Sequence, residues 1–419
     1  MKNKKTLFIV GLILISFLYL LIRLQNLDKL LGFRLDQGVH LLETKEMVDS
    51  KKIKLVGPMV TSKSFMGRNF FIGANYYYVL GIIGWVGQWN PLIITIIFIF
   101  LELVFYLFFI LFLKRNFNSF LALLTFVFIT VSPYLIIHSR FFWNPHLLIP
   151  LSILVLLFSE KYLLKKQNKY LFLMAFCWGF AFACHYSAVF WGLFFIFVLV
   201  KSKQIKKLKS YFIIIIGFIL GNLPFFVFEI LHNFYNIKTI FYIFINSSSS
   251  SGLASHYFVF PLLIFIIFGL LSLLFKIRNK ININIILVII FGLLFLIQIR
   301  FFSKYNPLDV IPSWSYPEQQ KIIELIIQND CPKNFNIAST ISGDTRSYDL
   351  RFLLTVKGCK PMGVEEYSKA EKVFLIAPVN RPPEKETVWE VSSLGKFKIN
   401  RQENLNPKII FYELEKIKE

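Results

Sequence analysis

The chain has 419 residues, of which 56% are hydrophobic, 18% aromatic and 17% charged. The charged fraction lies well below the roughly 25% of an ordinary soluble domain. This composition excludes a single soluble domain, a disordered chain and a small disulfide-rich module. The net charge of +22 resides almost entirely in residues 1–302, which hold 29 Lys or Arg against 8 Asp or Glu. Because short basic loops mark the cytoplasmic side of membrane proteins, this distribution indicates a lipid bilayer as partner and no nucleic acid.

Apolar runs long enough to cross a bilayer recur through residues 6–302. About 20 helical residues cross a hydrocarbon core of roughly 30 Å. The first run follows three lysines and lacks a small-residue cleavage site, so we interpret it as an uncleaved signal anchor with a cytoplasmic N-terminus. The nine predicted spans are Thr6–Ile22, Leu92–Leu113, Phe120–Ile137, Leu147–Leu164, Tyr170–Cys184, Ala188–Val200, Tyr211–Phe228, Tyr257–Phe275 and Ile285–Phe302.

Loop charges support this topology. Alternation from a cytoplasmic N-terminus places five basic segments with 17 cations inside, whereas the three short outside loops carry Arg140 and Lys238. The fifth and sixth runs are short, and we expect a break near His185. The apolar stretch 70–89 is interrupted by four glycines and would invert every later loop if it crossed, so we expect an interfacial or re-entrant segment there.

Two regions are therefore predicted to lie outside the membrane: the first loop, about residues 23–91, and residues 303–419. The second follows a proline-containing linker and holds 17 Lys or Arg against 16 Asp or Glu. One helical pattern and four short strand patterns predict a small extracytoplasmic α/β domain. Cys331 and Cys359 both lie on this oxidising side, and we predict that they form a disulfide. The helix is expected at 318–328 and the strands at 335–340, 372–378, 396–400 and 408–414.

Polar residues at the outer ends of the spans are the candidates for chemistry. Asp36, His40 and Glu43 share one helical face at i, i+4 and i+7, which fits either a solvated interfacial helix or part of a site. Arg140 fits a lipid-headgroup anchor and a phosphate-binding guanidinium equally well.

Three further residues lie at the same side of the predicted membrane domain. His185 and Tyr186 occupy the break between the fifth and sixth spans, and Glu229 closes the seventh. Taken singly, each fits a structural role. Taken with Asp36 and Arg140, they converge on one membrane face, which suits a lipid-linked phosphate substrate. No Cys or His spacing resembles a zinc site.

The order of several short motifs resembles a known family. The first outer loop opens with Asp36-Gln37, continues through LVGPMVTSKSFMG and the tyrosines at 76–78 to Asn90-Pro91, and is followed by HSRFFWNP and CHYSAVFW. Over about residues 1–302 this order resembles the GT-C membrane glycosyltransferases, in particular protein mannosyltransferases and aminoarabinose-transferase-like enzymes of glycosyltransferase family 39. The resemblance implies a GT-C-like membrane domain of about nine transmembrane helices followed by a variable outer domain.

The resemblance also implies a reaction. A sugar would pass, with inversion, from a polyprenyl-phosphate donor to a protein, lipid or glycan acceptor on the outer face. Asp36 matches the position of the family's catalytic base. Gln37 departs from the family's usual Glu and cannot supply a second negative charge. The resemblance implies no particular cofactor, and a divalent metal is left open. The residues expected to contact the substrates are Gln37, His40, Lys63, Arg68, Arg140, His185, Tyr186 and Glu229.

The residue inventory fits this chemistry, because an attacking hydroxyl needs one positioned carboxylate as base. The departing lipid phosphate is already a stabilised anion and needs cationic support rather than an acid carboxylate. Two alternatives stay open. A transporter or flippase of a lipid-linked saccharide predicts interrupted helices that meet at the bilayer midplane. A membrane-anchored binding or sensing protein would assign the activity to residues 303–419.

Overall fold

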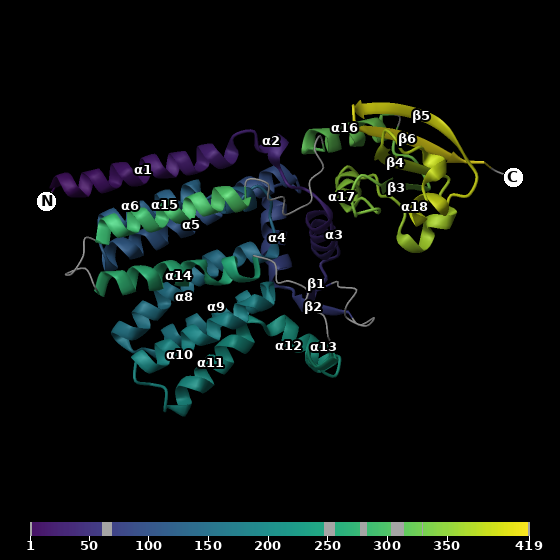
Figure 1. The fold of residues 1–419 in the computed structure, drawn as a ribbon. Helices are drawn as coiled ribbons and strands as arrows, with labels where there is room; N and C mark the ends of the chain where they lie inside the picture. Colours follow the sequence, from purple (N-terminus) through teal and green to yellow (C-terminus); the bar gives the residue numbers. More distant parts are fainter. Residues whose placement is uncertain are drawn as a thin grey trace.

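A computed structural model describes residues 2–60, 69–246, 256–276, 283–302, 314–328 and 330–417. Apolar helices lie side by side in a bundle, and a smaller domain with a four-stranded sheet lies beyond one end of it (Figure 1). The bundle consists of α1 (Lys2–Leu24), α5 (Pro91–Asn116), α6 (Ser119–Val131), α8 (Leu148–Lys165), α9 (Asn168–Cys184), α10 (Trp191–Lys201), α11 (Leu208–Gly221), α14 (His256–Lys276) and α15 (Ile283–Phe302).

Each of the nine predicted apolar runs is helical, which confirms the predicted polytopic helical fold. Within the described ranges, 3 helices are long and apolar enough to cross a membrane by themselves: Lys5–Leu24, Pro91–Asn116 and Asn144–Lys165. A fourth crossing results if Leu208–Gly221 and Leu223–Leu231, which meet at 82°, count as one span. The remaining apolar segments that meet the test are 10–17 residues long, and the predicted spans at 120–137 and 211–228 are each divided into two helices.

Three polar breaks separate the shorter helices. Ser132 ends α6, and its hydroxyl accepts the N–H of Leu135 at 3.4 Å to start α7 (Pro133–His138). His185 ends α9 and begins the 3₁₀ turn Tyr186–Phe190 that leads into α10, as the sequence predicted. Asn222 separates α11 from α12 (Leu223–Leu231).

Residues 70–89 do not form a span. They fold into β2 (Phe70–Gly73), which pairs antiparallel with β1 (Val56–Val60), and α4 (Asn75–Val86). At about 1.5 Å per residue, the 12 residues of α4 reach only about 18 Å. In Figure 1, α4 runs across the end of the bundle rather than along it, beside α3 (Leu35–Ser50).

Basic residues gather at the opposite end of the bundle. The Lys114 ammonium lies 3.9 Å from the ring centroid of Phe8, and Arg115 forms an ion pair with Glu160. The C-terminal end of α5 therefore meets the N-terminal end of α1 and the C-terminal end of α8. The two ends of the bundle differ in charge as the loops predicted, and a cytoplasmic location of the basic end stays a prediction.

The outer domain confirms the predicted α/β pattern. Its sheet has the order β3-β4-β6-β5, with β3 parallel to β4 and β6 antiparallel to both of its neighbours. The side-chain oxygen of Asn406 accepts the N–H groups of Lys408 and Ile409 at 3.0 and 3.1 Å, which closes the β5–β6 hairpin. The elements are α16 (Tyr316–Ile327), β3 (Phe335–Ser339), α17 (Tyr348–Val356), β4 (Lys372–Pro378), α18 (Trp389–Ser392), β5 (Phe397–Asn406) and β6 (Ile409–Lys416).

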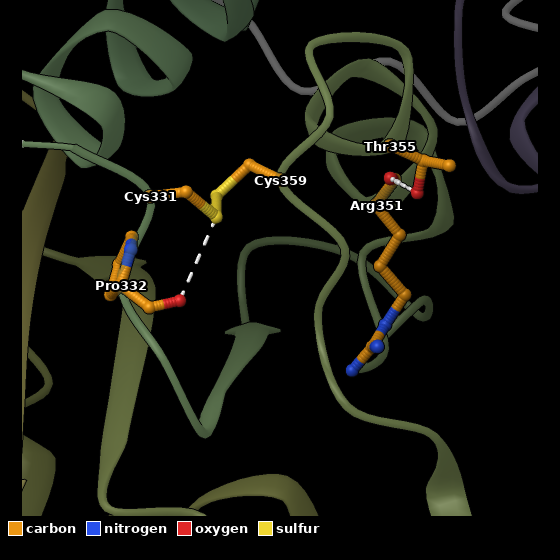
Figure 2. Close-up of a disulfide and its surroundings, with 5 residues drawn as sticks. All are labelled: Cys331, Pro332, Arg351, Thr355 and Cys359. Carbon is orange, nitrogen blue, oxygen red and sulfur yellow. Dashed lines mark hydrogen bonds between the residues drawn. A yellow bond between two sulfur atoms is a disulfide. The ribbon is translucent and has the colours of Figure 1, made fainter.

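The predicted disulfide between Cys331 and Cys359 is present. It joins the segment that follows α16 to the turn that follows α17 (Figure 2). The remaining short elements are α2 (Leu27–Leu30), the 3₁₀ turn Asn144–Leu147, α13 (Tyr235–Asn246) and the 3₁₀ turns Val364–Lys369 and Pro383–Lys385.

The outer domain packs directly on α3. Gly38 of α3 lies so close to α17 that a Cβ atom there would be 2.5 Å from the backbone of Tyr348. Arg34 donates to the carbonyl oxygen of Trp314 at 2.7 Å. The amide of Gln319 donates to the carbonyl oxygen of Phe33 at 2.9 Å and to the Asp349 carboxylate at 2.8 Å. The junction is therefore specific, and it holds the helix that carries Asp36.

Candidate active site

Asp36 lies in the first turn of α3, at the end of the bundle that faces the outer domain. The helix starts there because the Gln37 side-chain oxygen accepts the backbone N–H of Arg34 at 3.3 Å, which satisfies a donor at the helix start. A carboxylate in a first helical turn is also favoured by the helix dipole. The residues around position 36 therefore fix its backbone.

The Asp36 side chain is half-buried and faces an aromatic wall. Burial raises the pKa of its carboxyl above the ordinary value, and a hydrogen bond from the Trp143 side chain partly offsets this shift. Tyr76 and Tyr77, at the start of α4, lie close enough to interact electrostatically with Asp36. The arrangement is a carboxylate with raised proton affinity at the edge of an apolar, aromatic site.

Gln37 is fully buried and points away from Asp36 toward the segment after α7. Its amide donates to the carbonyl oxygen of Phe142 at 3.3 Å, while its oxygen accepts from Arg34. Both contacts hold α3 in place. The geometry gives Gln37 a positioning role, and direct contact with substrate stays a prediction.

His40 lies one helical turn after Asp36 and is only 4% exposed, whereas Asp36 and Glu43 on the same face are half-buried. Burial lowers the pKa of His40 to about 3, so the imidazole is neutral near pH 7. Its ring meets Tyr76 edge-on at 5.2 Å between centroids. Within the described residues, His40 Nδ1, Thr44 Oγ1 and the Tyr76 hydroxyl are buried without a hydrogen-bond partner. Such unpaired buried polar atoms are rare and costly, and here they lie beside the candidate base.

Arg140 lies beside the end of α1. Its guanidinium donates to the carbonyl oxygen of Ile22 at 3.2 Å, and its own carbonyl accepts the N–H of Gly32 at 2.9 Å. Burial and, to a lesser extent, the nearby Arg23 guanidinium lower the pKa of Arg140. Two guanidinium groups of like charge therefore share this corner of the bundle.

Arg23 was not among the candidates from the sequence, because it simply ended the first apolar run. It is fully buried and donates to the carbonyl oxygens of Thr130 and Ile129 at 3.0 and 3.1 Å. Its guanidinium also lies 3.6 Å from the ring centroid of Tyr19. Trp143 was likewise not among the candidates from the sequence, although its side chain donates a hydrogen bond to Asp36.

The remaining candidates lie on other elements. The His185 ring hydrogen-bonds the Ser187 hydroxyl at 2.7 Å, and the Tyr186 hydroxyl donates to the carbonyl oxygen of Phe71 at 2.5 Å. Glu229 is fully buried at the end of α12 and accepts two backbone N–H groups at the start of α13. None of these contacts joins them to Asp36. Lys63 and Arg68 lie outside the described residues.

No group of three or more His, Cys, Asp or Glu side chains that could hold a metal ion occurs in the part of the chain that the structure describes. Cys177 and Cys184 are buried free thiols.

Comparisons with known proteins agree with the predicted resemblance. The family described as dolichyl-phosphate-mannose-protein mannosyltransferase matches residues 76–228. The crystal structure of ArnT from Cupriavidus metallidurans bound to undecaprenyl phosphate has a similar fold, with a TM-score of 0.50 and 10% sequence identity over 99% of this chain and 98% of that chain. No curated protein sequence matches the chain. The chain therefore has the fold of a GT-C-type membrane protein and resembles the GT-C glycosyltransferases.

Proposed function

We propose that this protein is a multi-pass membrane glycosyltransferase that moves a sugar from a polyprenyl-phosphate donor to an acceptor at the outer face of the membrane. The position of a half-buried carboxylate and the resemblance to known glycosyltransferases both support this proposal. A half-buried carboxylate lies at the end of an apolar bundle, where a lipid-linked substrate can present its headgroup. The similar proteins are a mannosyltransferase family and an ArnT bound to undecaprenyl phosphate. Neither comparison favours a transporter.

The position of Asp36 carries the proposal. In the reaction, the acceptor oxygen forms a bond to the anomeric carbon of the sugar while the bond from that carbon to the phosphate oxygen breaks. The Asp36 carboxylate takes the proton of the acceptor, and the polyprenyl phosphate leaves with the bonding electron pair. Its raised pKa makes Asp36 a stronger base than an exposed aspartate. Because the acceptor attacks opposite the departing phosphate, the configuration at the anomeric carbon inverts.

Arg140 is our candidate for the donor phosphate. Arg23 lies beside it, but the buried Glu102 carboxyl already interacts electrostatically with Arg23. Arg140 Nε is instead buried without a hydrogen-bond partner among the described residues, so a phosphate placed there would receive charge-assisted hydrogen bonds from this guanidinium. His40 and Tyr76 offer unpaired polar atoms for sugar hydroxyl groups beside Asp36.

The test is a transfer assay with purified protein. The protein is reconstituted in lipid nanodiscs with undecaprenyl-phosphate mannose or undecaprenyl-phosphate aminoarabinose, with and without a membrane extract as acceptor source. Release of undecaprenyl phosphate is then followed by mass spectrometry. We expect acceptor-dependent release from one donor, with the sugar recovered on the acceptor. Movement of intact donor between leaflets without its consumption would instead support the transporter.

A further inference from the structure

A cavity lies between the membrane bundle and the outer domain, away from Asp36. Its volume is about 470 Å³, within the range of roughly 300–1,000 Å³ typical of small-molecule sites. One wall is the turn between α4 and α5, and the other consists of α16 and α17. The side chains that matter for recognition are Trp89, Tyr316, Gln320, Glu324, Gln328 and Lys357.

The membrane-side wall presents a fixed indole ring. Gln88 and Trp89 both have positive φ, at 51° and 59°, a conformation that costs free energy in residues other than glycine. The turn is held by a hydrogen bond from the Trp89 N–H to the carbonyl oxygen of Gly84 at 2.8 Å. The indole packs on Gly84 itself, where a Cβ atom would be 2.7 Å from the ring. Trp89 is therefore held in place, half-buried, where it lines the cavity.

The opposite wall presents polar side chains in a row. Gln320, Glu324 and Gln328 recur every four residues, so they share one face of α16 and its C-terminal end. All three are exposed, whereas Ile322 and Ile326 on the other face are buried. Lys357, at the end of α17, adds an ammonium group opposite in charge to Glu324. The disulfide between Cys331 and Cys359 ties the ends of these two helices together.

We propose that this cavity binds a neutral saccharide. A sugar ring has an apolar C–H face that packs on an aromatic ring and a rim of hydroxyl groups that both donate and accept hydrogen bonds. Side-chain amides and a carboxylate supply the matching donors and acceptors in planar pairs. One acidic and one basic side chain leave the wall without net charge, which favours an uncharged ligand over an anion.

The cavity is distinct from the reacting centre. Lys45 lies over the Trp89 ring at 5.4 Å, and it follows Asp36 by nine residues on α3. At about 1.5 Å per residue, the backbone positions of Lys45 and Asp36 are about 13 Å apart along the helix axis, and Asp36 is not among the residues that line the cavity. Saccharide binding at the cavity therefore does not rest on the transfer reaction proposed for Asp36.

The test is saturation-transfer difference NMR on the full chain in lipid nanodiscs, which avoids detergents with sugar headgroups. The probes are methyl α-mannopyranoside, methyl β-glucopyranoside and N,N′-diacetylchitobiose, with glycerol as the polyol control. We expect saturation transfer to at least one saccharide and none to glycerol. The double variant Gln320→Ala/Glu324→Ala should weaken that binding by about tenfold or more, since it removes two hydrogen-bonding side chains. Lys321→Ala, an exposed neighbour outside the cavity, should leave it unchanged.

A second pair of variants tests the aromatic wall. Trp89→Ala should reduce binding, whereas Trp85→Ala, which removes a 71% exposed indole of α4 outside the cavity, should not. Asp36→Asn should retain saccharide binding while losing transfer. The proposal is overturned if no saccharide binds, if the wall variants bind as well as the wild type, or if Asp36→Asn abolishes the signal.

Discussion

Two buried or half-buried carboxylates at the same end of the bundle differ in what holds them. Both oxygens of Glu229 accept backbone N–H groups, from Asn236 at 3.2 Å and Ile237 at 3.1 Å, so this side chain caps α13. Asp36 instead receives a hydrogen bond from the Trp143 side chain and lies beside unpaired polar atoms of His40 and Tyr76. A carboxylate whose oxygens are bound by its own backbone has a structural role, and one that faces unpaired groups is placed to react. The expected effects of substitution separate the two.

The largest expected effect comes from Asp36→Asn. The change keeps size and hydrogen bonding but removes the proton acceptor, so turnover should fall by roughly 10² to 10⁴ while donor binding persists. Transfer rate and donor affinity are measured on the same reconstituted protein. Glu43→Gln is the matched control, because Glu43 shares the helix face but is half-exposed and ion-paired with Lys54. A near wild-type rate in the Asn variant would exclude Asp36 as the base.

The second-largest effect is expected from Arg140→Ala, which should lower the affinity for the donor rather than the turnover rate. Loss of a charge-assisted contact to phosphate is worth about 1.5–3 kcal/mol, or roughly 10- to 150-fold in affinity. Arg140→Lys should recover part of it, because a point charge replaces a bidentate fork. Equilibrium binding of undecaprenyl phosphate is the measurement. Unchanged affinity in the Ala variant would return Arg140 to the role of a headgroup anchor.

Glu229→Gln should act on stability instead of chemistry. The neutral amide weakens two charge-assisted contacts to backbone N–H groups, and a cost of about 1.5–3 kcal/mol is expected. Thermal unfolding in nanodiscs should shift downward, while the rate per folded molecule stays near the wild type. A loss of turnover in a protein that is fully folded would place Glu229 in the reaction and remove the contrast with Asp36.

Gly38→Ala tests the junction that supports Asp36. The added methyl group meets the backbone of Tyr348 at 2.5 Å, and overpacking of this kind costs about 1–3 kcal/mol. We expect lower stability together with lower turnover, because α3 must move away from α17. Gly343→Ala, in the outer domain on the other side of the junction, is the control, since nothing lies within 4 Å of its added methyl group. Equal behaviour of the two variants would show that the junction does not support the site.

The smallest effect concerns pH. A base must be ionised, so activity should be lost as pH falls through the pKa of Asp36 in the folded protein. Because burial raises that pKa, the acid midpoint of kcat/KM should lie above the ordinary aspartate value of about 4. Trp143→Phe removes the hydrogen bond that opposes the shift and should move the midpoint further up. A midpoint at or below 4 in the wild type would contradict this environment for Asp36.

Much of the fold follows from the sequence, because burial in lipid and burial in a sheet leave different periodic patterns. The nine helical segments, the four outer strands, the break at His185 and the absence of a span at 70–89 were all predicted from local pattern, whereas β2 and α4 were not. The division of two predicted spans into shorter helices was not predicted. Single residues such as Ser132 and Asn222 interrupt an apolar run without changing its composition. The disulfide was predicted only because both cysteines were expected to lie on the oxidising side of the membrane.

The site was only partly predictable. Asp36 was identified by its position after the first span and by resemblance. The roles of Trp143 and Arg23 depend on contacts between distant segments, which no local pattern encodes. The sequence also separated residues 303–419 from the membrane domain and gave no indication that α17 packs on Gly38.

That packing has a consequence for how the protein is made. The contacts of Arg34 with Trp314 and of Phe33 with Gln319 join residues 280 and 286 positions apart. At about 5–20 residues per second, a ribosome needs roughly 14 to 56 s to synthesise the intervening chain. During that interval α3 lacks the surface on which it rests. The carboxylate proposed to activate the acceptor would thus reach its working position only after the outer domain has been made and folded, so an unfinished chain in the membrane stays inactive.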